Sequence, residues 1–358
     1  MQIIAGRPSY SATEPRAGRC RARVRRVRSL TFARSSVLGR TLNYISYLAL
    51  SLLAAARADR PDVVVAQTDP PVIGVVAALA AARFRCRFVF ICHDVHPDIG
   101  VALGMIANRP LIAAWRAVNR FIRGRADRIV VVGRDMREKL ERQGVAPDKL
   151  VYVPTWAPAD RADPAVSARR RHELGWTDRF VVMHAGNIGL AQNVGILADA
   201  AEHLRADPEI LIVLMGDGAA RQPLEREIAE RGLQNLQILP YRPRATAHEL
   251  MAAADVHVIS LVPGLWGCAA PSKTYAVMAM ARPFVAAVDV GSEPALIVEE
   301  CRCGAVVPAG DSQALAAALV AIKSAPREEL GANARRAFEA QFSAASCIAR
   351  LRAVIESG

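Results

Sequence analysis

The sequence predicts an α/β protein built from two Rossmann-like domains that face each other across a cleft. Its 358 residues are too many for one small core, so two domains are the natural expectation. Short apolar runs alternate with helix-like segments in both halves, which is typical of parallel, doubly wound sheets. Residues Thr155–Asp163, TWAPADRAD, interrupt this alternation and predict a hinge. We therefore expect domains at residues 1–160 and 161–342, and a helix at 343–358 that crosses back to the first domain.

Hydrophobic periodicity places the individual elements. In the first half, the expected strands are Val63–Ala66, Phe88–Cys92, Arg128–Val132 and Leu150–Val153, with helices at Val37–Arg57, Val72–Ala82, Ala113–Arg123 and Met136–Gln143. Met1–Tyr10 resembles a strand end and a turn, and Gly18–Leu30 an exposed strand. In the second half, the expected strands are Phe180–Ala185, Ile210–Met215, Leu236–Leu239, Val256–Ser260, Phe284–Ala287 and Gly304–Pro308, and helices are expected at Val194–Leu204, Thr274–Ala281, Gln313–Lys323, Arg327–Phe342 and Ala344–Glu356.

Arginine dominates the charge of the chain. The formal net charge is +12, and only four of the basic residues are lysines. The excess is concentrated early, in Arg16, Arg19, Arg21, Arg23, Arg25, Arg26, Arg28, Arg34 and Arg40. An apolar stretch with Tyr44 and Tyr47 follows, so the run is interpreted as a contact with an anionic membrane surface. An ordinary solvated surface is the alternative. No recognised nucleic-acid module follows, so we expect no nucleic-acid partner.

The composition also bears on where the protein resides. No apolar run reaches the roughly 18 residues that span a bilayer, and Leu42–Ala56 is interrupted by polar side chains. Met1–Tyr10 lacks the apolar core of a signal peptide. Seven scattered cysteines predict reduced thiols rather than a disulfide framework. We therefore expect a cytoplasmic protein, peripheral on the inner face of the plasma membrane if the basic run binds lipid.

A glycine loop in the second half is the main candidate for a ligand site. Val181–Asn193 reads VVMHAGNIGLAQN, which is a strand, a turn and the approach to a helix. Gly186 and Gly189 allow the backbone to turn sharply and to lie close to a ligand. The N–H groups of the following helix favour an anion at this loop. A sugar-nucleotide diphosphate fits this arrangement.

A cluster of ionisable residues follows a buried strand of the first half. The run His93-Asp94-Val95-His96-Pro97-Asp98 places imidazoles beside carboxylates at a strand end. A carboxylate next to an imidazole can orient a hydroxyl and move a proton, so His93 and Asp94 are candidate catalytic residues. A metal site and a helix cap are the alternatives. No second dense His/Asp cluster supplies further ligands, so we expect no metal.

The second half contains further candidates for a nucleotide site. Ser272 is expected to cap a helix, and Lys273 at its start is a candidate phosphate ligand. Gly216-Asp217-Gly218 is a weaker glycine turn after a strand. Tyr241 and Arg242 can hold a base by stacking, although an exposed turn would look the same. Glu293 can accept ribose hydroxyls.

The ordered set of these segments carries a family resemblance. HAGNIGLAQN, MGDG, PSKTYAVMAMARPF, GSE and GAVVPAGD resemble the C-terminal half of GT-B glycosyltransferases of family 4. In the first half, RTLNYISYLALS, PDVVVAQTDPPVIG, FVFICHDVHPDIGVALG and ADRIVVVGRDMREKL are similar to the bacterial branch that builds colanic acid, O-antigen and capsule, which includes the L-fucosamine transferase type. The match runs from Ile3 to the last helix.

The resemblance implies a GT-B fold and a retaining transferase that uses a nucleotide-activated sugar without a metal or another cofactor. It implies polyprenyl-linked glycans as acceptors. For the site, it implies His93 and Asp94 near the donor sugar or the acceptor hydroxyl, Gly186, Asn187, Gly189 and Lys273 around the diphosphate, Glu293 near the ribose, and Asp217, Tyr241 and Arg242 near the base. Many members carry an Arg–Lys pair near the glycine loop, where this chain has Asn187 and Gln192, and both of these residues are expected to bind the donor.

The start of the chain departs from the family pattern. The family begins with a strand, a glycine-rich loop and a helix ahead of the segment that matches Ile3–Tyr10. We expect either that translation begins upstream or that the chain is a truncated, weakened enzyme. Two other functions stay open: a GT-B sugar-nucleotide epimerase, which needs no acceptor, and a non-catalytic donor-binding or membrane-docking protein. A redox Rossmann enzyme is the least supported, because no GxGxxG with an acidic partner occurs.

Overall fold

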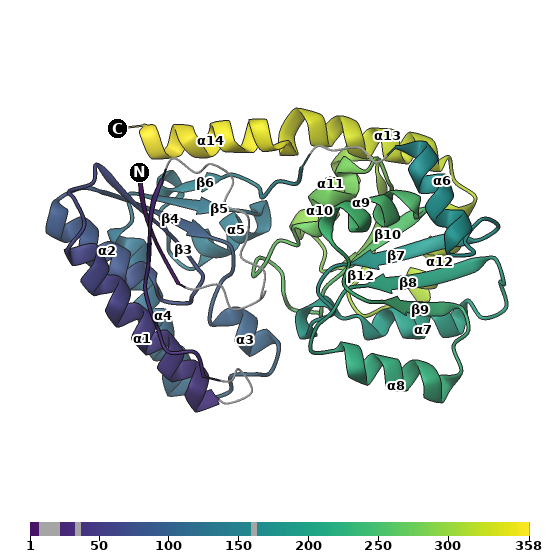
Figure 1. Ribbon diagram of the computed structural model, residues 1–358, viewed down its shortest axis with the longest axis horizontal. Coiled ribbons are helices and arrows are strands. Elements are labelled where there is room, and N and C mark those ends of the chain that lie inside the picture. The colour runs from purple at the N-terminus through teal and green to yellow at the C-terminus, as the bar shows by residue number, and fades with distance from the viewer. Residues whose placement is uncertain (7–21, 33–36, 159–162, 358) are drawn as a thin grey trace.

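The computed structural model describes residues 1–6, 22–32, 37–158 and 163–357, and Figure 1 shows their arrangement. It contains a four-stranded and a six-stranded parallel sheet, each belonging to one half of the chain, and a separate pair of strands. The predicted α/β fold with two Rossmann-like domains is confirmed. The expected boundary between residues 160 and 161 lies outside the described residues.

The first domain is organised around the sheet of order β3-β4-β5-β6. Its strands are β3 (Val63–Gln67), β4 (Arg87–Cys92), β5 (Arg128–Val131) and β6 (Leu150–Tyr152), all parallel. The accompanying helices are α1 (Val37–Ala56), α2 (Gly74–Phe84), α3 (Asp98–Ala102), α4 (Arg109–Arg125), α5 (Arg134–Arg142) and the 3₁₀ turn η1 (Pro147–Lys149). The parallel order brings the ends of β4 and β5 to one edge of the sheet.

The alternation of side chains along β4 explains why helices cover both faces of this sheet. Phe88 and Phe90 pack with residues of α2, α4 and α5 on one face. Val89 and Ile91 pack on the opposite face, against Cys347 and Val354 of the C-terminal helix α14 (Ala344–Glu356). Successive side chains of a strand point to opposite faces, so a strand buried on both faces is apolar throughout.

Helix α14 connects the second domain to the first. Figure 1 shows it running along the top of the molecule, from α13 to the four-stranded sheet. The guanidinium of Arg87 donates to the carbonyl of Ile355 at 3.2 Å and to that of Val354 at 3.3 Å, which satisfies the last turn of the helix. Ala157 and Ser343 form a β-bridge, so the two chain segments that cross between the domains lie side by side.

The strands at the N-terminus form a pair of their own. β1 (Gln2–Ala5) and β2 (Arg23–Arg26) are parallel and are not hydrogen-bonded to the four-stranded sheet. Ile4 of β1 and Val64 of β3 nevertheless contact the same apolar cluster on α1 and α2. Of the basic run, Arg16, Arg19, Arg21 and Arg34 lie outside the described residues, as do residues 7–10 and 18–21 of the two predicted N-terminal segments, and the Arg40 side chain is not described.

The second domain contains a six-stranded parallel sheet of order β12-β11-β10-β7-β8-β9. Its strands are β7 (Phe180–Ala185), β8 (Ile210–Met215), β9 (Leu236–Leu239), β10 (Val256–Ser260), β11 (Phe284–Val288) and β12 (Gly304–Pro308). Its helices are α6 (Pro164–Glu173), α7 (Gly195–His203), α8 (Arg221–Arg231), α9 (Arg244–Ala253), α10 (Lys273–Ala279), α11 (Glu293–Cys301), α12 (Ser312–Lys323) and α13 (Arg327–Ala337). Residues of α7, α8 and α12 cover one face, and residues of α9, α10, α11 and α13 cover the other.

Two of the predicted helices differ by more than two residues from the observed bounds. α4 begins at Arg109 rather than at Ala113, because the Asn108 side chain accepts a hydrogen bond from the amide of Leu111 and caps the first turn. The helix predicted over Arg327–Phe342 ends at Ala337 and continues as a π-helical turn, Phe338–Phe342. Both phenylalanines of that turn are buried. Packing therefore sets the end of this helix.

Candidate active site

Two glycine loops lie side by side at the C-terminal edge of the second sheet. The amide of Gly186 donates to the carbonyl of Met215 at 2.8 Å, and that of Ile188 donates to the carbonyl of Asp217 at 2.9 Å. Gly216 has a φ of 155°, and a Cβ at this position would lie 1.8 Å from the Gly186 carbonyl oxygen. Only glycine fits such an approach. The loops after β7 and β8 therefore form one continuous backbone surface.

The glycine loop after β7 collects four of the predicted donor ligands. Gly186 and Asn187 are exposed, and Gly186 has a φ of 127°. The side-chain Nδ2 of Asn187 donates to Gln192 Oε1 at 3.4 Å. A Cβ at Gly189 would lie 2.5 Å from Asn187 Nδ2 and 2.6 Å from Gln192 Oε1, so the two amide side chains converge over this glycine.

Lys273 reaches the same loop from the first residue of α10. A Cβ at Gly186 would lie 3.5 Å from Lys273 Cε and 3.6 Å from its Nζ. The Nζ atom lies 2.9 Å from Nε2 of His184, a fully buried residue of β7. Burial lowers the pKa of Lys273 to about 7. The structure thus brings the predicted cation to the predicted glycine loop, although the residues are 87 positions apart (273 minus 186).

His93 and Asp94 lie on the facing edge, at the end of β4. The Thr68 hydroxyl accepts hydrogen bonds from the amides of His93 at 3.1 Å and Asp94 at 3.3 Å. Asp94 also forms a backbone bridge with Ala269, in the loop that leads to Lys273. Burial is the main cause that raises the pKa of Asp94 and lowers that of His93. The loop 261–272 therefore joins the predicted catalytic pair to the predicted diphosphate ligand.

The residues predicted for the base lie at the open side of the sheet. Tyr241 follows β9 and is 74% exposed, and Arg242 beside it is also exposed. Asp217 is exposed between the two glycines of its loop, and its Oδ1 accepts the amide of Gly218 at 2.9 Å. These three side chains are accessible, and a contact with a nucleobase stays a prediction.

The structure corrects the role that was predicted for Ser272. This residue precedes α10, but it is exposed and its side chain makes no capping hydrogen bond. Its backbone dihedrals, φ −62° and ψ −21°, are already helical. An N-cap side chain reaches the helix amides from an extended backbone, so Ser272 is in the wrong conformation for capping.

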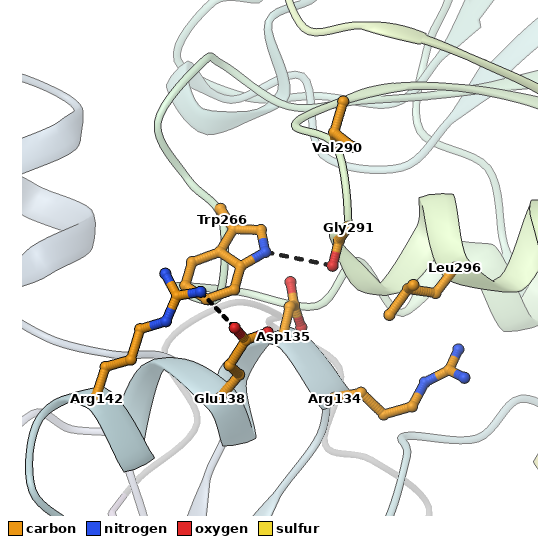
Figure 2. Close-up of a pocket in the computed structure, with 8 residues that line it drawn as sticks. All are labelled: Arg134, Asp135, Glu138, Arg142, Trp266, Val290, Gly291 and Leu296. Atoms are coloured by element: carbon orange, nitrogen blue, oxygen red, sulfur yellow. Dashed lines mark hydrogen bonds and ion pairs between the residues drawn. The ribbon is translucent and has the colours of Figure 1, made fainter.

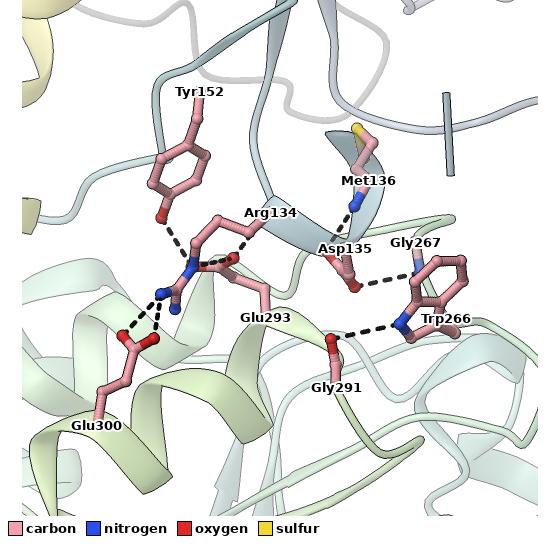
Figure 3. Close-up of polar contacts among 9 residues, drawn as sticks. All are labelled: Arg134, Asp135, Met136, Tyr152, Trp266, Gly267, Gly291, Glu293 and Glu300. Carbon is pink, nitrogen blue, oxygen red and sulfur yellow. Dashed lines mark hydrogen bonds and ion pairs between the residues drawn. The ribbon is translucent and has the colours of Figure 1, made fainter. Parts of the chain in front are cut away.

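Glu293 lies at the start of α11, where its carboxylate bonds to residues of the first domain. Its carboxylate is buried, and it accepts hydrogen bonds from the amide of Arg134 at 2.7 Å, from Arg134 Nε at 3.1 Å and from the Tyr152 hydroxyl at 2.7 Å. Figure 3 shows that Arg134 and Tyr152 come from the first domain and Glu293 from the second. The carboxylate thus has protein donors from the first domain, and a contact with a ribose stays a prediction.

Each half of the chain matches a family model of known glycosyltransferases. Residues 1–156 match a glycosyl transferase 4-like domain, and residues 179–324 match glycosyl transferases group 1. The order of the two models agrees with the two domains and with the site between their facing edges. The chain belongs to the GT-B glycosyltransferases of family 4. The predicted family and enzyme class are confirmed.

Known relatives of this glycosyltransferase cover most of its length. A Pseudomonas aeruginosa protein named as a probable glycosyltransferase, WbjE, is 28% identical over 303 residues, which are 82% of this chain and 74% of that protein. WcaI of Escherichia coli, whose name associates it with colanic acid biosynthesis, is 26% identical over 255 residues, 68% of this chain and 62% of that protein. The structure of Anabaena Alr3699/HepE in complex with UDP superposes with a TM-score of 0.74 at 18% identity, and covers 94% of this chain and 86% of that one.

The glycosyltransferase has a second polar site that the sequence did not reveal. A pocket of about 490 Å³ opens between α5 and the loops after β10 and β11 (Figure 2). Its lining residues are Arg134, Asp135, Glu138, Arg142, Trp266, Val290, Gly291 and Leu296. None of these is a predicted site residue. Arg134 and Asp135 do follow the buried strand β5. Like His93 and Asp94, they are ionisable residues just after a buried strand, and this pattern could have indicated them.

Asp135 and Trp266 hold the two domains together beside this pocket. Asp135 Oδ2 accepts the amide of Gly267 at 3.1 Å, and the Arg142 guanidinium lies 4.5 Å from the centre of the Trp266 ring. Burial, followed by the charge of Glu293, raises the pKa of Asp135 to about 6. Among the described residues, no three His, Cys, Asp or Glu side chains gather where they could hold a metal ion.

Proposed function

We propose that this glycosyltransferase moves a sugar from a nucleotide-sugar donor to a polyprenyl-linked glycan in the biosynthesis of a cell-surface polysaccharide, with retention of the anomeric configuration and without a metal. The donor binds at the glycine loops of the second domain, and the acceptor enters from the first domain. The observation that carries the proposal is the position of Lys273 against Gly186, on the loop that bridges to Asp94. The UDP complex of the Anabaena neighbour and the name of WcaI agree with it.

The leaving diphosphate needs stabilisation, because negative charge develops on it as the glycosidic bond breaks. We propose that the exposed backbone of Gly186 and Asn187 and the amine of Lys273 provide it. Donors that are already oriented towards developing charge stabilise a transition state without further reorganisation. The paired glycine loops hold this backbone in place through the bonds from Gly186 to Met215 and from Ile188 to Asp217.

His93 and Asp94 are proposed to act on the acceptor side of the cleft. Thr68 fixes their backbone, and the bridge to Ala269 sets their position relative to the donor loop. The burial that raises the pKa of Asp94 brings this carboxyl closer to the range in which it can exchange a proton near neutral pH. A carboxyl in this state can orient the attacking hydroxyl.

A membrane surface is proposed as the place where the acceptor is met. On α1, the side chains of Tyr44, Ile45, Leu52 and Leu53 are exposed, and α1 lies along the outer side of the first domain in Figure 1. β2 beside it presents exposed arginines, and Arg25 Nη1 contacts the Ala54 carbonyl of α1 at 3.4 Å. Apolar side chains next to arginines suit an anionic lipid interface. No described helix is both long and apolar enough to cross a bilayer.

A donor-screening assay tests the proposed function. Purified chain is incubated with radiolabelled UDP-, GDP- and dTDP-sugars, with and without a polyprenyl diphosphate-linked glycan. The proposal predicts label in the lipid fraction, dependent on both substrates and insensitive to EDTA. Conversion of the sugar nucleotide without acceptor would instead identify an epimerase. Binding without any conversion would identify a non-catalytic donor-binding protein.

A further inference from the structure

The environment of Lys273 is unlike that of the other three lysines. Lys139 Nζ donates to the Trp266 carbonyl, Lys149 Nζ to the carbonyls of Gly124 and Ala126, and Lys323 forms ion pairs with Asp207 and Glu209. Each of these three cations has an oxygen partner. In the part of the chain that the structure describes, Lys273 forms no ion pair. Its amine forms a hydrogen bond with a ring nitrogen of His184.

The hydrogen bonds of His184 define which of its nitrogens faces the lysine. Nδ1 lies 3.3 Å from the Val258 carbonyl oxygen, which can only accept, and this contact favours the tautomer in which Nδ1 carries the proton of the neutral ring. Nε2 then presents its lone pair to Lys273 Nζ at 2.9 Å. His184 is fully buried, and burial followed by the charge of Lys273 lowers its pKa well below the ordinary value. The ring is therefore a neutral acceptor for the amine.

The other groups around the amine do not compensate its charge. His257 on β10 is buried, and its pKa is lowered to about 4, so it is neutral. Asn187 and Gln192 on the glycine loop are uncharged amides that bond to each other. Asp217 on the neighbouring loop accepts its own loop amide and forms no ion pair with Lys273 among the described residues. The described residues around the amine therefore supply no anion to pair with its protonated form, and a bound anionic ligand would supply one.

We propose that His184 is a positioning residue that holds the Lys273 amine at the glycine loop, where no anion of the described chain pairs with it, and that binding of the donor diphosphate makes this amine take up a proton from solvent. The amine lone pair accepts the proton, and the resulting ammonium pairs with the diphosphate oxygens. This inference rests on the proposed donor site. The anion supplies the charge partner that the free protein lacks there, and an adjacent opposite charge favours the protonated form.

Calorimetry at pH 8 tests the proton uptake, with UDP as the probe and with buffers of different ionisation enthalpy. An amine with a pKa of about 7 is mostly uncharged at pH 8, so wild type should take up about 0.9 proton per UDP bound. Lys273→Arg is the matched control. Its guanidinium is always charged, so UDP should bind with little uptake of protons.

Binding of UDP to wild type with a heat that does not depend on the buffer overturns the inference alone. Failure of UDP, GDP and dTDP to bind overturns the proposed donor site as well.

Two substitutions test the positioning role of His184. His184→Gln keeps a side-chain acceptor for the amine, whereas His184→Leu removes it. We expect the Kd for UDP at pH 8 to rise about tenfold in His184→Leu and less than about threefold in His184→Gln, which corresponds to the loss or retention of one hydrogen bond to a charged group. Thermal melting of both variants reports on folding. Equal affinity in the two folded variants overturns the positioning role. If His184→Leu does not fold, a Kd in His184→Gln that is raised tenfold or more overturns it.

Discussion

Arg134 and Glu293 join the two domains through two hydrogen bonds to one carboxylate oxygen. Glu293 Oε2 accepts the Arg134 amide at 2.7 Å and Arg134 Nε at 3.1 Å. Tyr152 donates to the other oxygen at 2.7 Å, and Arg134 also bonds both oxygens of Glu300. Because Glu293 is buried and Glu300 is exposed, the two glutamates should differ in their contribution to the contact between the domains.

Glu293→Gln should destabilise the protein strongly. The substitution removes the buried charge to which the Arg134 amide, Arg134 Nε and the Tyr152 hydroxyl donate, while Arg134 keeps its pair with Glu300. Breaking a buried pair costs about 3 to 5 kcal/mol. Urea unfolding followed by circular dichroism measures the change. Glu300→Gln is the matched control, and its half-exposed pair with Arg134 should be worth less than about 1 kcal/mol. Equal effects of the two substitutions would contradict the proposed role of Glu293.

Lys273→Ala should lower turnover far more than stability. The amine stabilises the leaving diphosphate in the proposed mechanism, and loss of one such donor lowers kcat by about 10² to 10³. Its unfolding free energy should change little, because the lysine has no ion pair in the described structure to lose. Transfer kinetics and urea unfolding check the two statements. Unchanged turnover would remove Lys273 from the mechanism.

Asp94→Asn should reduce transfer while donor binding persists. The substitution keeps the size of the side chain and the hydrogen bond from the backbone amide of residue 94 to the Thr68 hydroxyl. It removes the acid–base function of the carboxyl group. We expect kcat to fall about 10²-fold, the usual range for a group that moves a proton. The Kd for UDP, which binds on the second domain, should stay within about twofold. Full activity would mean that Asp94 is a structural residue.

Acidification should remove the stability that comes from the neutral state of His257. Its folded pKa of about 4 lies below the ordinary value of 6.5, so the unfolded chain binds more protons between these values. This contribution is present above pH 6.5 and is lost as the pH falls towards 4. Between pH 7.5 and 4.5, the stability difference between wild type and His257→Gln should therefore shrink by about 2 to 3 kcal/mol. Urea unfolding at the two pH values measures it, and a constant difference would contradict the assignment.

Vesicle binding should depend on the exposed apolar side chains of α1. Ile45 is 58% exposed and Leu53 is 49% exposed, so an aspartate at either position can fold without a buried charge. In co-sedimentation with vesicles that contain anionic lipid, Ile45→Asp with Leu53→Asp should reduce binding at least about tenfold. Leu190→Asp, on the second domain and 54% exposed, is the control and should bind like wild type. Equal binding of all three proteins would exclude α1 as the membrane contact.

Apolar runs predicted the strands well, because the sheets are buried on both faces. The expected strand Ile210–Met215 is β8, and all six of its side chains are buried. Glycines at strand ends likewise predicted the loop of Gly186, whose φ of 127° favours glycine. The residues at which helices begin were predicted less well, as α4 shows. Its cap, Asn108, precedes the periodic part of the helix and was overlooked.

Contacts between distant segments explain why the protein partners of some site residues could not be predicted from the sequence. Glu293 follows a strand like other ligands at a sheet edge, but Arg134 and Tyr152 lie 159 and 141 residues away in the chain. The relative position of the domains determines which donors meet this carboxylate, and periodicity does not encode that position. His184 was overlooked for a related reason. Its partner Lys273 is 89 residues away. In the sequence, His184 is one more residue of a buried strand.

Hydrogen–deuterium exchange with added UDP tests the central claim most directly, which is that the donor diphosphate lies on the paired glycine loops beside Lys273. We expect slower exchange in peptides that cover 184–193 and 214–219 of wild type, and a much smaller effect in Lys273→Ala. The pocket of Figure 2 provides the contrast, because it opens onto α5 and residues 290–296. Protection confined to that pocket, with exchange at the glycine loops unchanged, would show that the donor diphosphate does not lie on these loops.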